Sequence, residues 1–356
     1  MPSTSEPQTL VDRTGALGRI RLNRPKALNS LTLPMIRDID RALDAFEVDP
    51  DVTAVLLTGE GERGLCAGGD IRMIYEGGKA GSPEPVDFWR EEYRLNARLN
   101  RLQKPFVAFM DGIVMGGGVG VSVYASHRIV TERTRFAMPE NGIGFFPDVG
   151  ASWFLTRRKN ELGTYAGLTG EPLAAADAIA FGLADSYVPS ERLPELAEAL
   201  SRQPDVPATI ATFSQTPPPA SVAAQQPLID RLFAFDTIED ILKALAQDGS
   251  AFAEKTLGVL RTKSPLSLKV TLRLLRLGRQ APSLEACLER EFAATAAVLR
   301  SHDFYEGVRA AVIDKDRNPQ WRPARLDDVT AEHVAAFFEP SAKPLFVVDA
   351  GKGERL

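Results

Sequence analysis

Met115–Gly120, with the sequence MGGGVG, is the stretch that decides the fold of this 356-residue chain. It comes after Phe106–Met110, a continuous apolar run that is typical of a fully buried strand. Glycines at a strand-to-helix turn let the backbone approach a ligand with no Cβ in between, and the helix that follows directs free N–H groups at that ligand. We expect this helix over residues 120–125.

A second glycine turn lies upstream, at residues 66–70 (CAGGD), after the β-rich run of residues 52–59. Two backbone N–H groups aimed at one point stabilise the negative oxygen that forms when a thioester or ester carbonyl is attacked. We therefore expect Gly69 to donate one such hydrogen bond and Gly117 the other. Either turn alone indicates only a tight bend, whereas both turns with acids downstream indicate acyl chemistry.

Two acids follow the second turn, Glu140 and Asp148, each directly after a proline. Glycines and a proline between them interrupt any helix, so we expect a looped segment that lets both carboxylates face one cavity. Two consecutive phenylalanines just before Asp148 predict an apolar wall beside it. Carboxylates in such a place can move protons or attack a carbonyl carbon.

Strand-like and helix-like segments alternate in the first 200 residues, which predicts an α/β fold. Thr32 is expected to cap the first helix and Ile71 to begin another. Later helices are expected to start after Ser264 and Ser283. The ranges expected to be helical are 86–102, 228–235, 238–247, 251–262, 265–277 and 284–299.

Composition divides the chain into four parts. We expect a core that carries the site over residues 8–203 and a Pro- and Ala-rich linker over residues 204–228. A helical region over residues 229–340 and a weakly ordered tail over residues 341–356 complete the chain.

Composition also excludes several classes of function. The formal net charge of −5, with basic residues spread along the chain, indicates no nucleic-acid partner. No run approaches the length of about 18 apolar residues that a membrane span needs. The start of the chain has no signal-peptide features, which predicts a cytoplasmic location. Cys66 and Cys287 lack disulfide or metal-ligand spacing, so no metal site is expected.

The sequence motifs of other enzyme classes are missing or do not fit. The glycines at residues 115–120 do not fit the dinucleotide pattern, and the chain has no phosphate-binding loop. The GxSxG motif of serine hydrolases is missing. Of the three histidines, His127 is expected at a helix end and His302 is either a cap or a late active-site contact. Nucleotide chemistry and a catalytic triad are therefore disfavoured.

The chain resembles the crotonase (enoyl-CoA hydratase/isomerase) superfamily over nearly its whole length. Residues 22–29 (LNRPKALN) match the family's early CoA-binding loop, and both glycine turns match its oxyanion turns. A late run from Phe304 to Trp321 is typical of the branch that hydrolyses acyl-CoA thioesters. The resemblance implies a spiral of ββα turns followed by a helical C-terminal region.

The resemblance also assigns roles. It implies an acyl-CoA substrate whose carbonyl is held by Gly69 and Gly117, with Glu140 and Asp148 as catalytic acids and Glu92 as a substrate contact. The second catalytic glutamate of the family's hydratases matches Gly120, which has no side chain to move a proton. The remaining substrate-binding positions that the resemblance implies are Arg24, Lys26, Ala27, Leu28, Ala67, Gly68, Asp70 and Gly116.

By that resemblance the expected reaction is hydrolysis of a short 3-hydroxyacyl-CoA, namely 3-hydroxyisobutyryl-CoA in valine catabolism. The alternatives are hydration or isomerisation of an enoyl-CoA, hydrolysis of another short acyl-CoA such as 3-hydroxypropionyl-CoA, and acyl-CoA binding without turnover. No cofactor is expected, since CoA is part of the substrate. The resemblance leaves a trimer, a hexamer and a monomer open.

Overall fold

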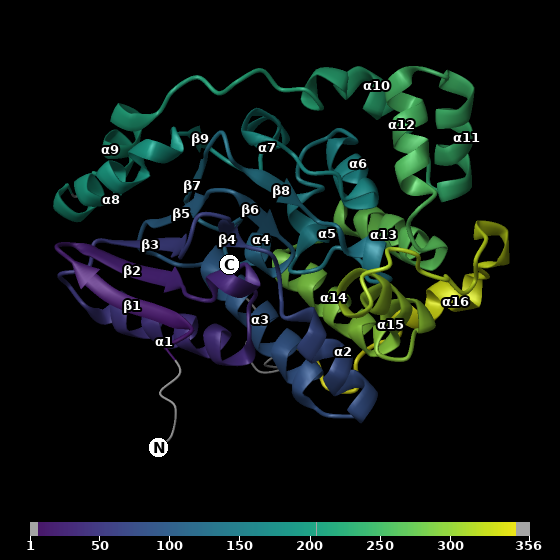
Figure 1. The fold of residues 1–356 in the computed structure, drawn as a ribbon, viewed down its shortest axis with the longest axis horizontal. Coiled ribbons are helices and arrows are strands. Elements are labelled where there is room, and N and C mark those ends of the chain that lie inside the picture. The colour runs from purple at the N-terminus through teal and green to yellow at the C-terminus, as the bar shows by residue number, and fades with distance from the viewer. Residues whose placement is uncertain (1–5, 204, 347–356) are drawn as a thin grey trace.

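Two β-sheets form the centre of the computed structural model, which describes residues 6–203 and 205–346 (Figure 1). The larger sheet has six strands in the order β1-β2-β3-β5-β7-β9, and the smaller has three in the order β4-β6-β8. Among the strands of the described residues, β1 and β2 pair antiparallel and all other strand pairs are parallel. The strands are β1 (Thr9–Thr14), β2 (Leu17–Leu22), β3 (Ala54–Gly59), β4 (Gly64–Cys66), β5 (Phe106–Met110), β6 (Ile113–Met115), β7 (His127–Val130), β8 (Arg135–Ala137) and β9 (Ser186–Tyr187).

Successive strands alternate between the two sheets. β3, β5 and β7 lie in the larger sheet, and each is followed within a few residues by β4, β6 or β8 of the smaller one. The chain therefore winds as a spiral of ββα turns, and the predicted α/β class is confirmed. β4 and β6 run parallel, with Cys66 opposite Val114. Because the carboxyl ends of neighbouring parallel strands meet at one edge, the two glycine turns that follow them lie side by side.

The helices cover both sheets and form most of the C-terminal half (Figure 1). Those of residues 6–203 are α1 (Leu33–Val48), α2 (Ile71–Ala80), α3 (Glu84–Asn100), α4 (Gly117–Gly120), α5 (Ala151–Phe154), α6 (Leu162–Thr169), α7 (Ala175–Phe181) and α8 (Leu193–Arg202). The rest are α9 (Val206–Phe213), α10 (Gln226–Leu232), α11 (Ile238–Asp248), α12 (Ala251–Leu260), α13 (Pro265–Gly278), α14 (Leu284–Val298), α15 (His302–Val308) and α16 (Ala331–Ala335). Thr32, Ser264 and Ser283 cap α1, α13 and α14 as predicted.

Short 3₁₀ turns and one π turn complete the described elements. The 3₁₀ turns are η1 (Pro25–Ala27), η2 (Glu140–Ile143), η3 (Ser190–Arg192), η4 (Ala223–Gln225), η6 (Leu326–Asp328) and η7 (Ala336–Phe338), and the π turn is η5 (Arg309–Ile313). Over residues 6–203 and 205–346, no helix combines the length and the apolar character of a bilayer span.

Two hydrophobic clusters lie on opposite sides of the larger sheet. The smaller cluster joins Leu56 and Val107 to Leu196 of α8 and Ile210 of α9. The larger one runs from the sheets into the C-terminal helices and includes Phe304 of α15. The C-terminal helices therefore share the main core with the spiral, which lets their side chains reach the site.

Several local predictions differ from the structure. The helix expected over residues 120–125 is instead the single turn α4, which begins at Gly117, because Gly116 adopts a φ of 49° and its carbonyl accepts the N–H of Gly120. His127 begins β7 and does not end a helix. The expected linker contains α9, η4 and the start of α10, joined by an extended stretch (Figure 1), while residue 204 lies outside the described residues.

Part of the expected tail is packed. Leu345 is buried, its N–H donates to both carboxylate oxygens of Glu289, and its carbonyl accepts from Arg94. Residues 347–356 lie outside the described residues. The fourfold division of the chain stays a prediction.

Candidate active site

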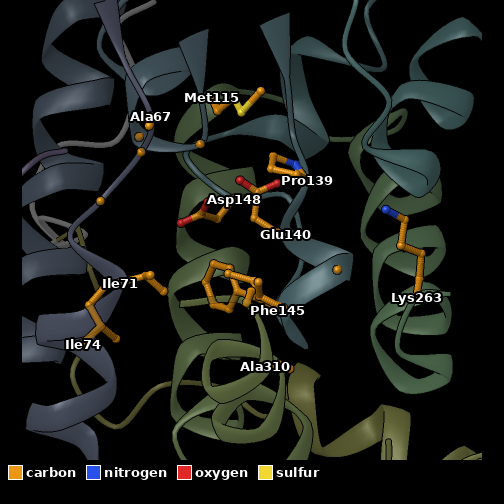
Figure 2. Close-up of a pocket in the computed structure, with 18 of the residues that line it drawn as sticks. Ala67, Ile71, Ile74, Met115, Pro139, Glu140, Phe145, Asp148, Lys263 and Ala310 are labelled. Atoms are coloured by element: carbon orange, nitrogen blue, oxygen red, sulfur yellow. The ribbon is translucent and has the colours of Figure 1, made fainter. Parts of the chain in front are cut away.

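A cavity of about 990 Å³ lies where the two glycine turns meet the acid segment. Figure 2 shows Glu140 and Asp148 side by side between Met115 and Phe145, with Lys263 on the far side of the cavity from Ile71. Residues of the C-terminal half, including Gly307 and Ala310, also line it. The cavity therefore draws its walls from both halves of the chain.

The backbone at Gly69 is held so that its N–H is free. Leu31 donates its N–H to Gly68 and accepts the N–H of Asp70 on its carbonyl, both at 2.8 Å. In this parallel pairing the N–H of the intervening Gly69 points away from Leu31. Its nitrogen lies 3.2 Å from the place that a Cβ on Gly117 would take. The first turn therefore presents its amide to the second.

Gly117 is the first residue of α4, where the N–H has no partner within the helix and the helix dipole is positive. Within residues 6–203 and 205–346, neither this N–H nor that of Gly69 donates to a protein acceptor. A Cβ on Gly117 would lie only 2.4 Å from Oε1 of Glu92, and one on Gly118 only 2.4 Å from the Cys66 carbonyl oxygen. The backbone contact leaves no room for a side chain at Gly118, whereas one at Gly117 would have to displace the Glu92 carboxyl. Two free amides this close together can donate to one oxygen.

Three carboxyl groups border these amides. Glu140, Asp148 and Glu92 are all buried, and Oε1 of Glu140 lies 3.0 Å from the place of a Cβ on Gly116. In the described part of the chain, Oε2 of Glu140 and Oε1 of Glu92 have no hydrogen-bond partner. Glu140 begins the 3₁₀ turn η2, so the segment is less irregular than the sequence predicted. Acceptors without partners in a cavity are suited to meeting a ligand.

Burial sets the protonation of these acids. Loss of hydration raises the pKa of Asp148 to about 7, although a hydrogen bond from Tyr93 opposes the rise. Burial raises the pKa of Glu140 well above its ordinary value, and the neighbouring Asp148 charge adds to it. The pKa of Glu92 is raised by burial and then by Asp148 and Glu140. A carboxyl group whose pKa is raised by burial can hold a proton and donate it during a reaction.

Side chains on α3 and in the aromatic wall fix the second acid. The hydroxyl of Tyr93 donates to Oδ2 of Asp148 at 2.7 Å, and both groups are buried. Phe145 stacks on Trp89 with ring centroids 5.6 Å apart and on Phe146 at 4.5 Å. The apolar wall predicted from the two phenylalanines is therefore present.

The position that matches the hydratases' second glutamate is filled by other atoms. A Cβ on Gly120 would lie 2.8 Å from Cβ of Val149 and 3.0 Å from Nδ2 of Asn96. Asn96 also donates that amide to the Gly120 carbonyl at 3.0 Å. A longer side chain at residue 120 would therefore have to displace the residue directly after Asp148.

The structure separates the other predicted substrate-binding residues into two groups. Leu28, Ala67, Gly68 and Gly116 line the cavity together with Glu92 and the two donor glycines. The remaining four, which are Arg24, Lys26, Ala27 and Asp70, are not among its lining residues.

Arg24 and Asp70 also have structural partners. Their side chains pair at 2.9 Å, and Arg24 also donates to the carbonyl and hydroxyl of Ser30. Asp70 accepts the N–H of Met73 and so caps α2. Lys26 is exposed on η1. The pairing holds the early loop against the first glycine turn, which is a structural use that the sequence reasoning missed.

Three further residues at the site were missed. Tyr93 bonds Asp148, Lys263 lines the cavity with its pKa lowered by burial, and Glu291 of α14 reaches the turn after Asp148. Tyr93 directly follows Glu92, so its place on α3 could have been considered from the sequence. No local pattern marks Lys263 or Glu291, because each reaches the site through tertiary packing.

A family model described as enoyl-CoA hydratase/isomerase matches residues 17–338. Among curated proteins, the chain is 44% identical to the mitochondrial 3-hydroxyisobutyryl-CoA hydrolase of Rattus norvegicus, over 94% of this chain and 90% of that protein. Its identity to the Homo sapiens protein of the same name is 42%, over 93% and 88%.

Two solved structures match almost the whole chain. A carnitinyl-CoA dehydratase from Mycobacterium thermoresistibile superposes with a TM-score of 0.92 at 45% identity, covering 96% of this chain and 99% of that one. An enoyl-CoA hydratase from Rhodobacter sphaeroides superposes with a TM-score of 0.89 at 40% identity, covering 96% and 100%. These likenesses establish the fold that the sequence resemblance implied.

Proposed function

The chain belongs to the enoyl-CoA hydratase/isomerase family, and from that premise we propose that it hydrolyses 3-hydroxyisobutyryl-CoA to 3-hydroxyisobutyrate and CoA. One observation carries the proposal above all. The free amides of Gly69 and Gly117 converge on a cavity that also holds the carboxyls of Glu140 and Asp148. That set of groups can polarise a thioester carbonyl and supply both a base and an acid.

A second observation favours hydrolysis over hydration. The names of curated relatives with 42–44% identity support hydrolysis, while solved structures with 40–45% identity are named as a dehydratase and a hydratase, so the site itself has to separate the two reactions. The space beside Gly120 that a second glutamate would need is occupied by Val149 and Asn96. Two acids on one loop, without a third opposite them at residue 120, suit water attack at a carbonyl better than water addition across a double bond.

In the mechanism we propose, the thioester oxygen accepts both turn amides at roughly 3 Å. Glu140 either attacks the carbonyl carbon and forms a mixed anhydride that water then opens, or takes a proton from water that attacks directly. In both routes the C–S bond breaks and the CoA thiolate takes a proton, which Asp148 donates in this proposal. CoA belongs to the substrate, and these groups supply the chemistry without a further cofactor.

The two routes are separated by single turnover in ¹⁸O-labelled water. Water that opens the anhydride at the Glu140 carbonyl leaves the label in the Glu140 carboxyl, whereas direct attack on the thioester places it only in the released acid. Mass spectrometry of the peptide that contains Glu140 reads the difference.

The function is tested by thiol release from a panel of short acyl-CoA thioesters, with loss of the conjugated absorbance of crotonyl-CoA measured in parallel. We expect rapid thiol release from 3-hydroxyisobutyryl-CoA and little change with crotonyl-CoA. Tight CoA binding with no turnover of any thioester would contradict the proposal. So would hydration that exceeds hydrolysis.

The cellular location and the assembly of the chain stay predictions. The relatives named above are mitochondrial proteins, whereas the sequence analysis predicted the cytoplasm. Trimer, hexamer and monomer remain the predicted alternatives for the assembly.

A further inference from the structure

The backbone directly after Asp148 takes an unusual course. Val149 adopts a φ of 51° and Gly150 a φ of 84°, so two consecutive residues lie in the left-handed region. A β-branched residue rarely adopts that conformation, and it persists only where surrounding contacts impose it. The direction in which Asp148 projects therefore depends on whatever holds this turn.

Contacts from distant elements hold the turn. The hydroxyl of Tyr124 donates to the Val149 carbonyl at 2.7 Å, and the Val149 side chain fills the space over Gly120. The N–H of Ala151 donates to the Asp148 carbonyl at 2.8 Å. These contacts fix the carbonyl side of the turn, but they leave the N–H groups of Gly150 and Ser152 to find other partners.

The carboxyl group of Glu291 accepts hydrogen bonds from those N–H groups. Its Oε2 accepts the N–H of Gly150 at 2.6 Å, and its Oε1 accepts the N–H of Ser152 at 3.0 Å and the Ser152 hydroxyl at 2.5 Å. Glu291 is fully buried on α14, 143 positions after Asp148. Three donors that converge on one buried carboxyl group form a clamp on the turn.

We propose that Glu291 is a positioning residue of the hydrolytic site, which fixes the turn over residues 148–152 and so aims the Asp148 carboxyl at the substrate. The inference rests on the proposed function. Glu291 does not line the cavity, and it acts only through the backbone that carries Asp148. The C-terminal helical region thus takes part in the chemistry without touching the substrate.

The three donors of the turn explain why residue 291 has to carry a carboxyl group. Two backbone N–H groups and one hydroxyl need acceptors on both oxygens, which glutamine cannot offer because one of its polar atoms is an NH₂ donor. The substitution Glu291→Gln keeps the shape of the side chain and places that NH₂ group against at least one backbone N–H. It should loosen the turn without creating a cavity.

Glu289 provides a matched control on the same helix. Its carboxylate also accepts two backbone N–H groups, those of Leu345 and Phe346, but these lie in the C-terminal segment. Glu289→Gln therefore removes the same chemical feature two residues away from Glu291 and leaves the Asp148 turn alone. Both variants are made in the full chain.

We expect Glu291→Gln to lower kcat by about 10²-fold, the usual cost of misplacing a catalytic group by about 1 Å, while KM changes by less than about twofold. Glu289→Gln should keep both constants near the wild-type values. Ser152→Ala, which deletes only the hydroxyl donor, should lower kcat by a few-fold and serves if Glu291→Gln does not fold. Equal kcat values for all these variants and the wild type would overturn the proposal.

A double substitution separates positioning from a general structural role. If Glu291 acts through Asp148, Glu291→Gln should have little further effect on kcat in the Asp148→Asn background. An undiminished loss in that background would contradict the proposal.

Hydrogen exchange gives a readout that needs no activity. The Gly150 and Ser152 amides should be protected in the wild type and exchange faster in Glu291→Gln, but not in Glu289→Gln. Unchanged protection would overturn the clamp. A wild type that hydrolyses no thioester would refute the proposed function, while the exchange result would still decide the clamp.

Discussion

The two glycine turns and the acid segment face the same cavity, but they are held in place by different means. The turns are fixed by backbone bonds inside the first 120 residues: the β4–β6 pairing and the bridge from Leu31. The acid segment depends on residues far along the chain. A Cβ on Gly144 would lie 2.1 Å from the Asp303 carbonyl, so this loop packs backbone to backbone against α15. The donors are thus built into the spiral, whereas the acids need the C-terminal helices.

The two regions also differ in electrostatics. The turn amides are neutral dipoles that border a cavity, so holding them in position for a ligand costs little free energy. The acids are ionisable groups taken out of water, and burial raises the pKa of each of them by disfavouring the charged form. The comparison predicts that changes in the acid segment alter activity and pH dependence together, whereas changes in the turns alter activity alone.

The largest effect is expected from the acid that lies beside the amides. Glu140→Gln removes the nucleophile or base while keeping the size of the side chain, and should lower kcat for thiol release by about 10³-fold. KM should stay within about threefold, since the amides are untouched. Glu171→Gln, at a partly exposed glutamate that pairs with Lys255, is the control and should remain fully active. Full activity of Glu140→Gln would remove the catalytic role from this residue.

The next largest effect is expected at the donor turn. Gly117→Ala places a Cβ against Oε1 of Glu92 and should shift the amide, which costs about 10²-fold in kcat. Gly258→Ala is the matched control, because a Cβ there meets no atom within 4 Å and the position lies inside α12. It should keep full activity and unfold at a slightly higher temperature. Similar kcat values for the two alanine variants would contradict the role of the Gly117 amide as a hydrogen-bond donor to the substrate.

A smaller effect tests the link between the two regions. Gly120→Glu would supply the acid that hydratases use, but its side chain must displace Val149. We expect no gain of crotonyl-CoA hydration, a loss of thiol release of about tenfold and a loss of about 1–3 kcal/mol in the free energy of unfolding, as overpacked cores show. Efficient hydration by this variant would mean that Val149 and Asn96 leave room for a side chain at residue 120.

The smallest effect concerns stability against pH. Asp148 keeps its proton in the folded chain up to about pH 7, whereas in the unfolded chain it releases it near pH 4. Its contribution to stability is therefore complete below about pH 4 and is lost as the pH rises through about 7. The wild-type Tm should fall between pH 5 and pH 8. The Tm of Asp148→Asn should fall over the same range by about 2–4 °C less than that of the wild type. Parallel Tm curves for the two proteins would contradict the raised pKa.

The residues that sequence reasoning located are those with a local signature. Gly69 and Gly117 stand in turns directly after strands, and Glu140 and Asp148 each follow a proline, so their neighbourhood could be predicted from spacing. The same reasoning misplaced the start of α4 by three residues, because propensity disfavours glycine within a helix and tertiary packing overrides that preference.

Residues with no local signature escaped prediction. A glutamate on a helix is ordinarily exposed, yet Glu291 is buried because α14 packs against α3 and α5. The ion pair of Arg24 with Asp70, a partner 46 positions away, was also not predicted, while its expected contact with CoA stays a prediction. Long-range pairing of this kind follows from how the spiral closes, which no short window of sequence encodes.

The central claim is that the amides of Gly69 and Gly117 both donate to the thioester oxygen of a bound acyl-CoA. Isotope-edited infrared difference spectroscopy tests it on Glu140→Gln with a ¹³C-labelled thioester carbonyl, since that variant holds the substrate without turning it over. We predict a carbonyl band at lower frequency in the complex than in water, and a smaller shift when Gly117→Ala is added. A band at its solution frequency in the complex would contradict the account.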